Sequence, residues 1–215
     1  MDKPEAAGLA GAGAGVRARP DEGPLARICR LLEPDPRLCE RVCSTSAEWE
    51  GRVFSVELLD VALPDGSHGR RELVRHHGGA GVGAIREDGC ICLVRQFRVA
   101  LGRVSLEIPA GRLEPGEDGP RCAARELGEE TGLVAGRLEP VARSLGSPGF
   151  TDEATQVFLA YELSAGSSHP DEGELVDVAW VPLDEVLAGI RAGLIDDGKT
   201  IVAAQAAALR AHGLA

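Results

Sequence analysis

Glu126, Glu129 and Glu130 stand three and four residues apart in a segment that contains no proline. On an α-helix, side chains at i, i+3 and i+4 share one face, so these carboxylates would project together. Three like charges repel one another, but they suit a divalent cation, because Mg²⁺ prefers oxygen ligands and often contacts substrate phosphates as well. The alternative is an ordinary acidic helix face in contact with solvent, which the carboxylates alone leave open.

The residues on either side of these glutamates are typical of a loop, a helix and a second loop. Glycine, proline and acidic residues are frequent over 111–119, where the backbone could bring carbonyl oxygens close to a bound cation. Pro120 suits the first turn of a helix and Gly132 suits the residue after its end, so we expect a helix over about 121–131.

The spacing of the whole segment resembles a known motif. Residues 111–133 read G-R-L-E-P-G-E-D-G-P-R-C-A-A-R-E-L-G-E-E-T-G-L. This run resembles the Nudix box at every fixed position: G, five residues, E, seven residues, then R-E-U-x-E-E-x-G-U, where U is apolar. The resemblance to the Nudix hydrolase superfamily implies an α+β fold, an α/β/α sandwich with a mixed sheet and a loop-helix-loop motif. It also implies hydrolysis of a nucleoside diphosphate linked to a second group.

The resemblance implies roles for several residues in the motif and for Ala110, which directly precedes it. Glu126 and Glu130 would be the main metal ligands, and Glu129 would be a further ligand or a base. Arg125 would orient the carboxylates by ion pairing, and the backbone carbonyl of Ala110 would be an additional ligand. The implied cofactor is Mg²⁺, with Mn²⁺ as the alternative, and the chemistry is metal-ion catalysis.

Three further segments resemble the ADP-ribose pyrophosphatase subgroup. They are E-I-P-A-G at 107–111, Q-F-R at 96–98 and S-P-G-F-T-D-E at 147–153. The resemblance covers about 49–211 and implies cleavage of ADP-ribose to AMP and ribose 5-phosphate. Arg98 is a candidate contact for the pyrophosphate, because a guanidinium can bind phosphate oxygens bidentately, and Glu107 is a second candidate substrate contact. The alternative for Arg98 is an exposed strand arginine.

The segment 147–153 would form a turn at Pro148 and Gly149 and carry the carboxylates of Asp152 and Glu153 at its tip. A carboxylate on a mobile loop can approach an attacking water and act as a general base. The resemblance assigns that role to Glu153. The alternative is an acidic surface loop.

Recognition of the nucleobase has less support in the sequence. Members of the subgroup clamp adenine with aromatic side chains of the N-terminal region, partly from the other subunit of a swapped homodimer. Only Trp49 and Phe54 are aromatic before residue 97, and we expect Trp49 to stack on the base. Packing of Trp49 at the start of a strand is an equal alternative.

The composition limits the other functional classes. The 215 residues carry a formal net charge of −11, which disfavours binding to nucleic acid or to an anionic membrane. No apolar run approaches the roughly 20 residues of a membrane helix, and no convincing signal peptide is present. The six cysteines form no C-x-x-C pair, so we expect reduced thiols and a reducing, cytoplasmic compartment.

We expect a disordered Ala/Gly-rich tail at 1–24, an N-terminal extension at 25–50 with a short helix near 38–42, and the Nudix domain at 51–215. Glu87-Asp88-Gly89 reads as a turn between two strands. The expected strands are 53–63, 71–77, 81–85, 90–99, 104–108, 138–144, 156–162 and 175–181, and the further helices are 183–192 and 199–211.

Two alternatives for the function remain. One is a Nudix hydrolase acting on another substrate, such as GDP-mannose, NADH or an oxidised nucleotide. The other is a non-catalytic module that senses nucleotides, which would be expected to lose carboxylates of the motif. The motif here is complete.

Overall fold

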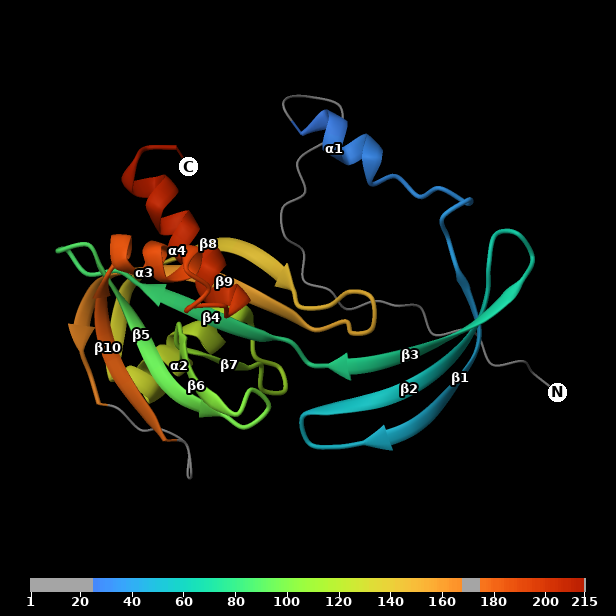
Figure 1. Ribbon diagram of the computed structural model, residues 1–215, viewed down its shortest axis with the longest axis horizontal. Coiled ribbons are helices and arrows are strands. Elements are labelled where there is room, and N and C mark those ends of the chain that lie inside the picture. The colour runs from blue at the N-terminus through green and yellow to red at the C-terminus, as the bar shows by residue number, and fades with distance from the viewer. Residues whose placement is uncertain (1–24, 168–174, 215) are drawn as a thin grey trace.

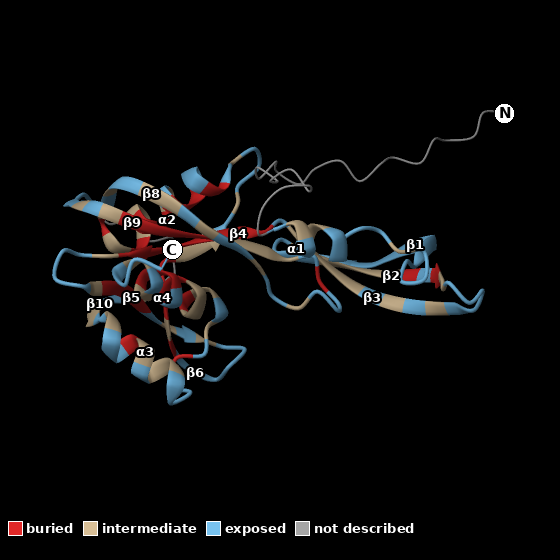
Figure 2. Ribbon diagram, turned by 90° about the horizontal axis from the view of Figure 1, so that it is seen from above, coloured by how far each residue is buried: buried red, intermediate tan, exposed pale blue. Residues whose placement is uncertain are grey.

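The computed structural model describes residues 25–167 and 175–214, and the tail expected at 1–24 lies outside the described residues. An N-terminal sheet extends from the side of an α/β body, and the two are joined where one strand of the sheet runs on into the body (Figure 1). Buried residues are concentrated in the body, whereas this N-terminal arm is mostly exposed or half-buried (Figure 2).

The arm is an antiparallel sheet in the order β1-β2-β3. Its strands are β1 (Arg41–Glu50), β2 (Phe54–Ala62) and β3 (His68–His76). The prediction of a short helix near 38–42 is wrong. The strand β1 begins at Arg41, and the N-terminal helix is α1 (Ala26–Leu31). Val42 and Thr45 are β-branched, and β2 supplies backbone partners along almost the whole of β1, so pairing decides in favour of the strand.

The body contains two sheets, and their orders are β7-β4-β9-β8 and β10-β5-β6. β4 and β9 are parallel, and the other pairs are antiparallel, so the expected mixed arrangement is confirmed. The expected turn before Gly89 is present, but the strands on its two sides belong to different sheets and share only the bridge Ile85–Ile91. The strands are β4 (Gly79–Ala84), β5 (Cys90–Arg98), β6 (Arg103–Glu107), β7 (Ala110–Arg112), β8 (Leu133–Leu145), β9 (Ala154–Ala165) and β10 (Val176–Pro182).

Helices pack on both faces of the body. The helices are α2 (Gly119–Thr131), α3 (Leu183–Arg191) and α4 (Gly198–Ala211). Successive side chains of β9 point to opposite faces: Leu159 joins the apolar cluster that contains residues of α3 and α4, and Phe158 joins the cluster that contains Leu127 of α2. The α/β/α sandwich expected from the sequence is therefore confirmed. Among the described residues, no helix has the length and apolar content needed to cross a membrane.

Both ends of α2 follow from local sequence. The side chain of Asp118 caps the helix by accepting a hydrogen bond from the Arg121 amide at 3.0 Å, and Pro120 occupies the first turn. Gly132 ends the helix in the left-handed conformation, with φ of 69°, which a residue with a side chain rarely adopts. The predicted loop-helix-loop is confirmed, with the helix starting two residues earlier than expected.

Candidate active site

The α2 carboxylates are not on an open surface. Glu126 and Glu130 are 8% and 3% exposed, and Leu127 between them packs in the core. An acidic helix that served only as a solvated face would expose its carboxylates, because burying a charge costs free energy unless other groups compensate it. The structure therefore argues against the solvated acidic helix.

Arg125 compensates much of this negative charge. Its Nε donates to Oε1 of Glu117 at 2.9 Å, and its Nη1 donates to Oε1 of Glu126 at 2.7 Å and to Oε2 of Glu129 at 2.8 Å. The hydrogen bond from Arg125 lowers the pKa of Glu117 to about 2, and the same bond is the main cause of the raised pKa of Arg125. One guanidinium thus holds three carboxylates in fixed positions.

The strand β7 brings backbone groups to the same place. The amide of Ala110 donates to Oε2 of Glu130 at 3.2 Å. A Cβ atom on Gly111 would lie 1.9 Å from Oε1 of Glu126, so only glycine leaves room for that carboxylate. The first glycine of the motif is required here for space, since its backbone conformation is an ordinary one.

Two buried thiols in this region have raised pKa values, chiefly because they are buried and secondly because carboxylates lie nearby. Burial, and after it the charge of Glu130, raises the pKa of Cys92 to about 12. Burial, followed by the charges of Glu117 and Glu126, raises the pKa of Cys122 to about 12.

An excess of negative charge attracts a cation. Among the described residues, no three His, Cys, Asp or Glu side chains already converge as a metal site, and the Arg125 guanidinium lies among the carboxylates.

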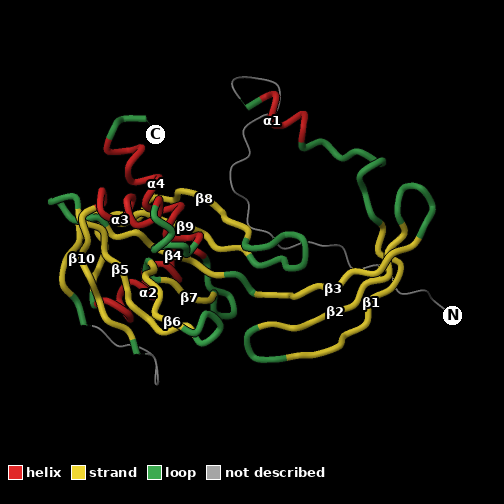
Figure 3. The backbone as a smooth tube through the Cα atoms, in the orientation of Figure 1, coloured by secondary structure: helices red, strands yellow, loops and turns green. Residues whose placement is uncertain are grey.

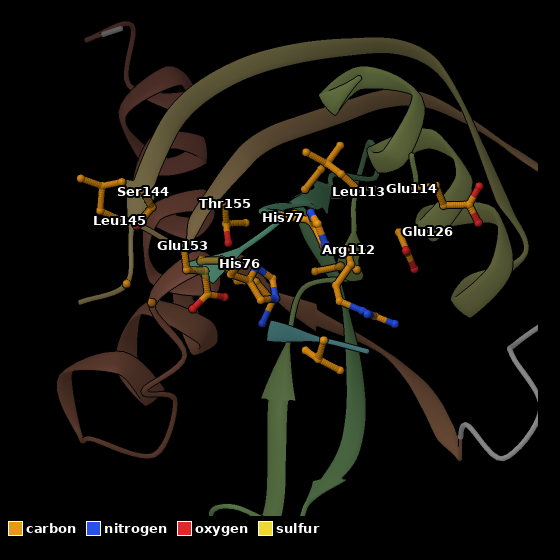
Figure 4. Close-up of a pocket in the computed structure, with 18 of the residues that line it drawn as sticks. His76, His77, Arg112, Leu113, Glu114, Glu126, Ser144, Leu145, Glu153 and Thr155 are labelled. Atoms are coloured by element: carbon orange, nitrogen blue, oxygen red, sulfur yellow. The ribbon is translucent and has the colours of Figure 1, made fainter. Parts of the chain in front are cut away.

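A pocket of about 890 Å³ opens beside these residues, within the size range of ligand sites. Figure 4 shows Glu126 on one side of it and Glu153 on the other, with His76 between them. The pocket also contains many basic groups, although the chain as a whole is acidic. The basic residues that line it are Arg52, His76, His77, Arg98, Arg112, Arg125 and Lys199. An anionic ligand would find several candidate donors in it.

Arg98 lines this pocket, but much of its guanidinium is already bound. Its Nε and Nη2 each donate to a different carboxylate oxygen of Glu107 at 2.8 Å. Lys199 donates to the same carboxylate at 2.5 Å and to Asp197 at 2.8 Å. Burial raises the pKa of Glu107, but Arg98 and Lys199 more than offset this and lower it to about 2.

This buried network contains Arg98 and Glu107, the two residues of the body that the sequence predicted as substrate contacts. Glu107 is not among the residues that line the described pocket, and it contacts Arg98 and Lys199, which both do. In this structure Glu107 thus lies behind the pocket wall and fixes the orientation of two basic side chains.

The segment 147–153 forms the expected turn, with the amides of Phe150 and Thr151 donating to the Ser147 carbonyl at 3.0 Å. Glu153 lines the pocket, but Asp152 binds Arg75 and the His76 amide instead. Burial raises the pKa of Asp152, and these two donors offset it so that the pKa is lowered overall. Of the two carboxylates expected at the tip of this loop, only that of Glu153 lines the pocket.

Trp49 lies elsewhere in the structure. Its ring packs against Phe54 with a centroid distance of 4.9 Å and covers Gly51, where a Cβ would lie 1.9 Å from the ring. Half of its surface is exposed, and it does not line either described pocket, although Gly51 and Phe54 line the smaller one.

Several lining residues were not predicted from the sequence. Arg52 lies in the loop after β1 and His77 follows the end of β3, and neither belongs to a recognisable motif; Arg112 lies inside the motif at 111–133, but at a position that the motif leaves variable. Lys199 did have a weak signal, because a lysine in the first turn of a helix interacts unfavourably with the helix dipole. Asp197 caps that helix by accepting from the Thr200 amide at 3.0 Å.

Comparison with known proteins agrees with this geometry. The sequence model of the NUDIX domain family matches residues 75–204. The chain is 40% identical over 168 residues to an ADP-ribose pyrophosphatase of Bacillus subtilis, covering 77% of this chain and 91% of that protein. It is equally similar, with the same coverage, to a methanol dehydrogenase activator of Bacillus methanolicus. A crystal structure of an ADP compounds hydrolase has the same fold, with a TM-score of 0.73 and 20% identity, over 83% of this chain and 98% of that one.

Proposed function

Because the chain belongs to the Nudix family, we propose that it is a metal-dependent hydrolase that cleaves ADP-ribose to AMP and ribose 5-phosphate. The observation that carries this proposal is the pair of buried carboxylates, Glu126 and Glu130, beside a pocket with many basic groups. The name of the Bacillus subtilis relative supports the choice of ADP-ribose.

The proposed cofactor is Mg²⁺, with Mn²⁺ as the alternative. Glu126 and Glu130 would hold it, with Glu129 and the carbonyl oxygen of Ala110 as further ligands. This set consists of oxygen atoms, which suits a hard divalent cation, and the space left by Gly111 admits the Glu126 carboxylate. When bound, such a cation supplies an activated water and neutralises charge on the phosphate oxygens. Arg125 would keep the carboxylates charged and aligned.

Glu153 is proposed as the general base. Its position across the pocket from Glu126 supports this role, since a diphosphate between the two walls would have the carboxylate of Glu153 on one side. Glu153 would take one proton from the attacking water as the water oxygen bonds to phosphorus and the bridging P–O bond breaks. Glu129 is the alternative base within α2.

Arg98 is proposed as a contact for the diphosphate. A guanidinium has five N–H donors, and Glu107 occupies two of its nitrogens, so the remaining donors can bind a phosphate oxygen. Glu107, assigned to the substrate from sequence, would act through Arg98 by keeping this group oriented.

We also propose a homodimer formed through the arm. Every residue of β1 is exposed to solvent. Two of them, Val42 and Trp49, are large apolar residues with about half of their surface exposed, and a second copy of the chain would cover them. Trp49 would then contact the nucleobase at a site to which two subunits contribute.

All six cysteines lie in the described part and are free thiols, which supports a cytoplasmic location.

A panel of substrates tests the function: ADP-ribose, GDP-mannose, NADH, diadenosine polyphosphates and 8-oxo-dGTP, each with Mg²⁺ and with EDTA. We expect AMP and ribose 5-phosphate from ADP-ribose, detected by chromatography, and no product with EDTA. If GDP-mannose or NADH were turned over faster than ADP-ribose, that compound would become the proposed substrate in place of ADP-ribose. Binding of ADP-ribose without turnover of any compound would identify a nucleotide-sensing module.

A further inference from the structure

The loop between β8 and β9, which carries Glu153, is bonded to the N-terminal arm. Figure 3 shows this loop beside the end of β3, where the chain passes from the arm into the body. The Val74 amide donates to the Phe150 carbonyl at 2.8 Å, and the Asp152 amide donates to the Val74 carbonyl at 3.3 Å. Val74 and Thr151 form a parallel bridge. The loop thus pairs with the edge strand of the arm through one isolated bridge.

Side chains strengthen this backbone contact. Oδ1 of Asp152 accepts from the His76 amide at 2.9 Å, and Oδ2 accepts from Nη1 of Arg75 at 3.1 Å. Nε of Arg75 donates to Glu57 of β2 at 2.9 Å. Arg75 therefore connects two strands of the arm to the loop.

The attachment ends one residue before the proposed base. The Glu153 amide donates to Oγ1 of Thr151 at 3.1 Å, and Thr151 is itself buried. The Glu153 side chain then turns into the pocket. A surface loop without such contacts would sample many positions, and a misplacement of about 1 Å can slow catalysis about 100-fold.

We propose that Arg75 and Asp152 are positioning residues that fasten the Glu153 loop to β3, so that the arm determines where the general base lies. This inference rests on the proposed role of Glu153. It makes the arm part of the catalytic apparatus, although neither Arg75 nor Asp152 reaches the reacting atoms.

Steady-state kinetics with ADP-ribose and Mg²⁺ tests the proposal in the full chain. The variants are Arg75→Gln, Asp152→Asn, the double variant and Arg75→Lys, with Glu153→Gln as a reference. Asn at 152 can still accept from the His76 amide, which protects the fold. Arg70→Gln is the matched control, because Arg70 also lies on β3 but pairs with Asp60 of β2. Thermal unfolding and oligomeric state are measured for each variant.

We expect kcat to fall about 10- to 100-fold in both single variants, with KM changed less than about threefold. The double variant should be no slower than the slower single variant, because both changes break the same contact. Arg75→Lys should recover part of kcat, and Arg70→Gln should resemble the wild type. A residue with only a structural role would not separate kcat from KM in this way.

Wild-type kcat in Arg75→Gln and Asp152→Asn, with Glu153→Gln impaired, would overturn the positioning role and leave the proposed function intact. An equal loss of kcat in Arg70→Gln would also overturn it, by showing that any damage to the arm has this effect. Wild-type kcat in Glu153→Gln would overturn both the assignment of Glu153 as the general base and the positioning role of Arg75 and Asp152.

Discussion

Glu107 offers the most quantitative prediction, because it is buried between two cations. Its side chain is 6% exposed, and it binds Arg98 at 2.8 Å and Lys199 at 2.5 Å. In the folded protein its pKa is lowered from 4.5 to about 2. A difference of this size corresponds to roughly 3 kcal/mol of folding stability at neutral pH. Glu107→Gln removes the charge and leaves both cations without it, so we expect a loss of about 3 kcal/mol at pH 7.

The stabilisation by Glu107 depends on pH in a defined direction. Because the folded pKa is the lower one, the stabilisation is complete above pH 4.5 and is lost as pH falls toward 2. At pH 3.5, one unit below the unfolded pKa, roughly 1 kcal/mol should be lost. Glu107→Gln has no charge to titrate at this position. The difference in unfolding free energy between the wild type and Glu107→Gln should therefore become smaller by that amount.

Urea unfolding followed by circular dichroism, at several pH values between 3.5 and 7, measures this difference. Glu139→Gln is the matched control, because Glu139 also pairs with two arginines, Arg137 and Arg210, but at the surface. We expect it to cost no more than about 1 kcal/mol. A cost below about 1 kcal/mol for Glu107→Gln, or a difference that stays constant with pH, would refute the buried-network argument.

Three further predictions concern catalysis. Glu130→Gln should abolish Mg²⁺-dependent turnover while the protein stays folded, as measured by product release and circular dichroism; wild-type turnover would overturn its assignment as a ligand. Glu153→Gln should lower kcat at least about 100-fold with little change in KM, and a change in KM alone would make it a binding residue. Gly111→Ala should displace the Glu126 carboxylate and weaken Mg²⁺ activation at least about tenfold, with the thermal midpoint nearly unchanged; normal metal dependence would contradict the spatial reason for this glycine.

Local sequence was sufficient to predict the helix α2 and its two ends. The spacing of Glu126, Glu129 and Glu130 places them on one face because the helical period is fixed, and the cap at Asp118 and the glycine at 132 define its ends. Most strands of the body were also predicted near their observed ends, since β-branched runs between turn residues are local signals.

The strand β1 could not be predicted from its own residues. Its sequence, R-V-C-S-T-S-A-E-W-E, has no regular apolar alternation, and all of it is exposed. Pairing with β2 determines its conformation, and that partner is known only when the chain is folded. The assignment of adjacent strands to different sheets has the same origin, because a turn does not specify which strands will pair.

The sequence by itself determined which residues carry charge and which of them share the α2 face. Only the tertiary structure decided how those charges are compensated. Glu107 meets Lys199 across 92 positions of the chain, and Asp152 meets Arg75 across 77. Such pairs form when separate strands, loops and helices pack together, so no periodicity or spacing in the sequence encodes them. Burial then determines their strength, because a charge pair shielded from water interacts far more strongly than one at the surface.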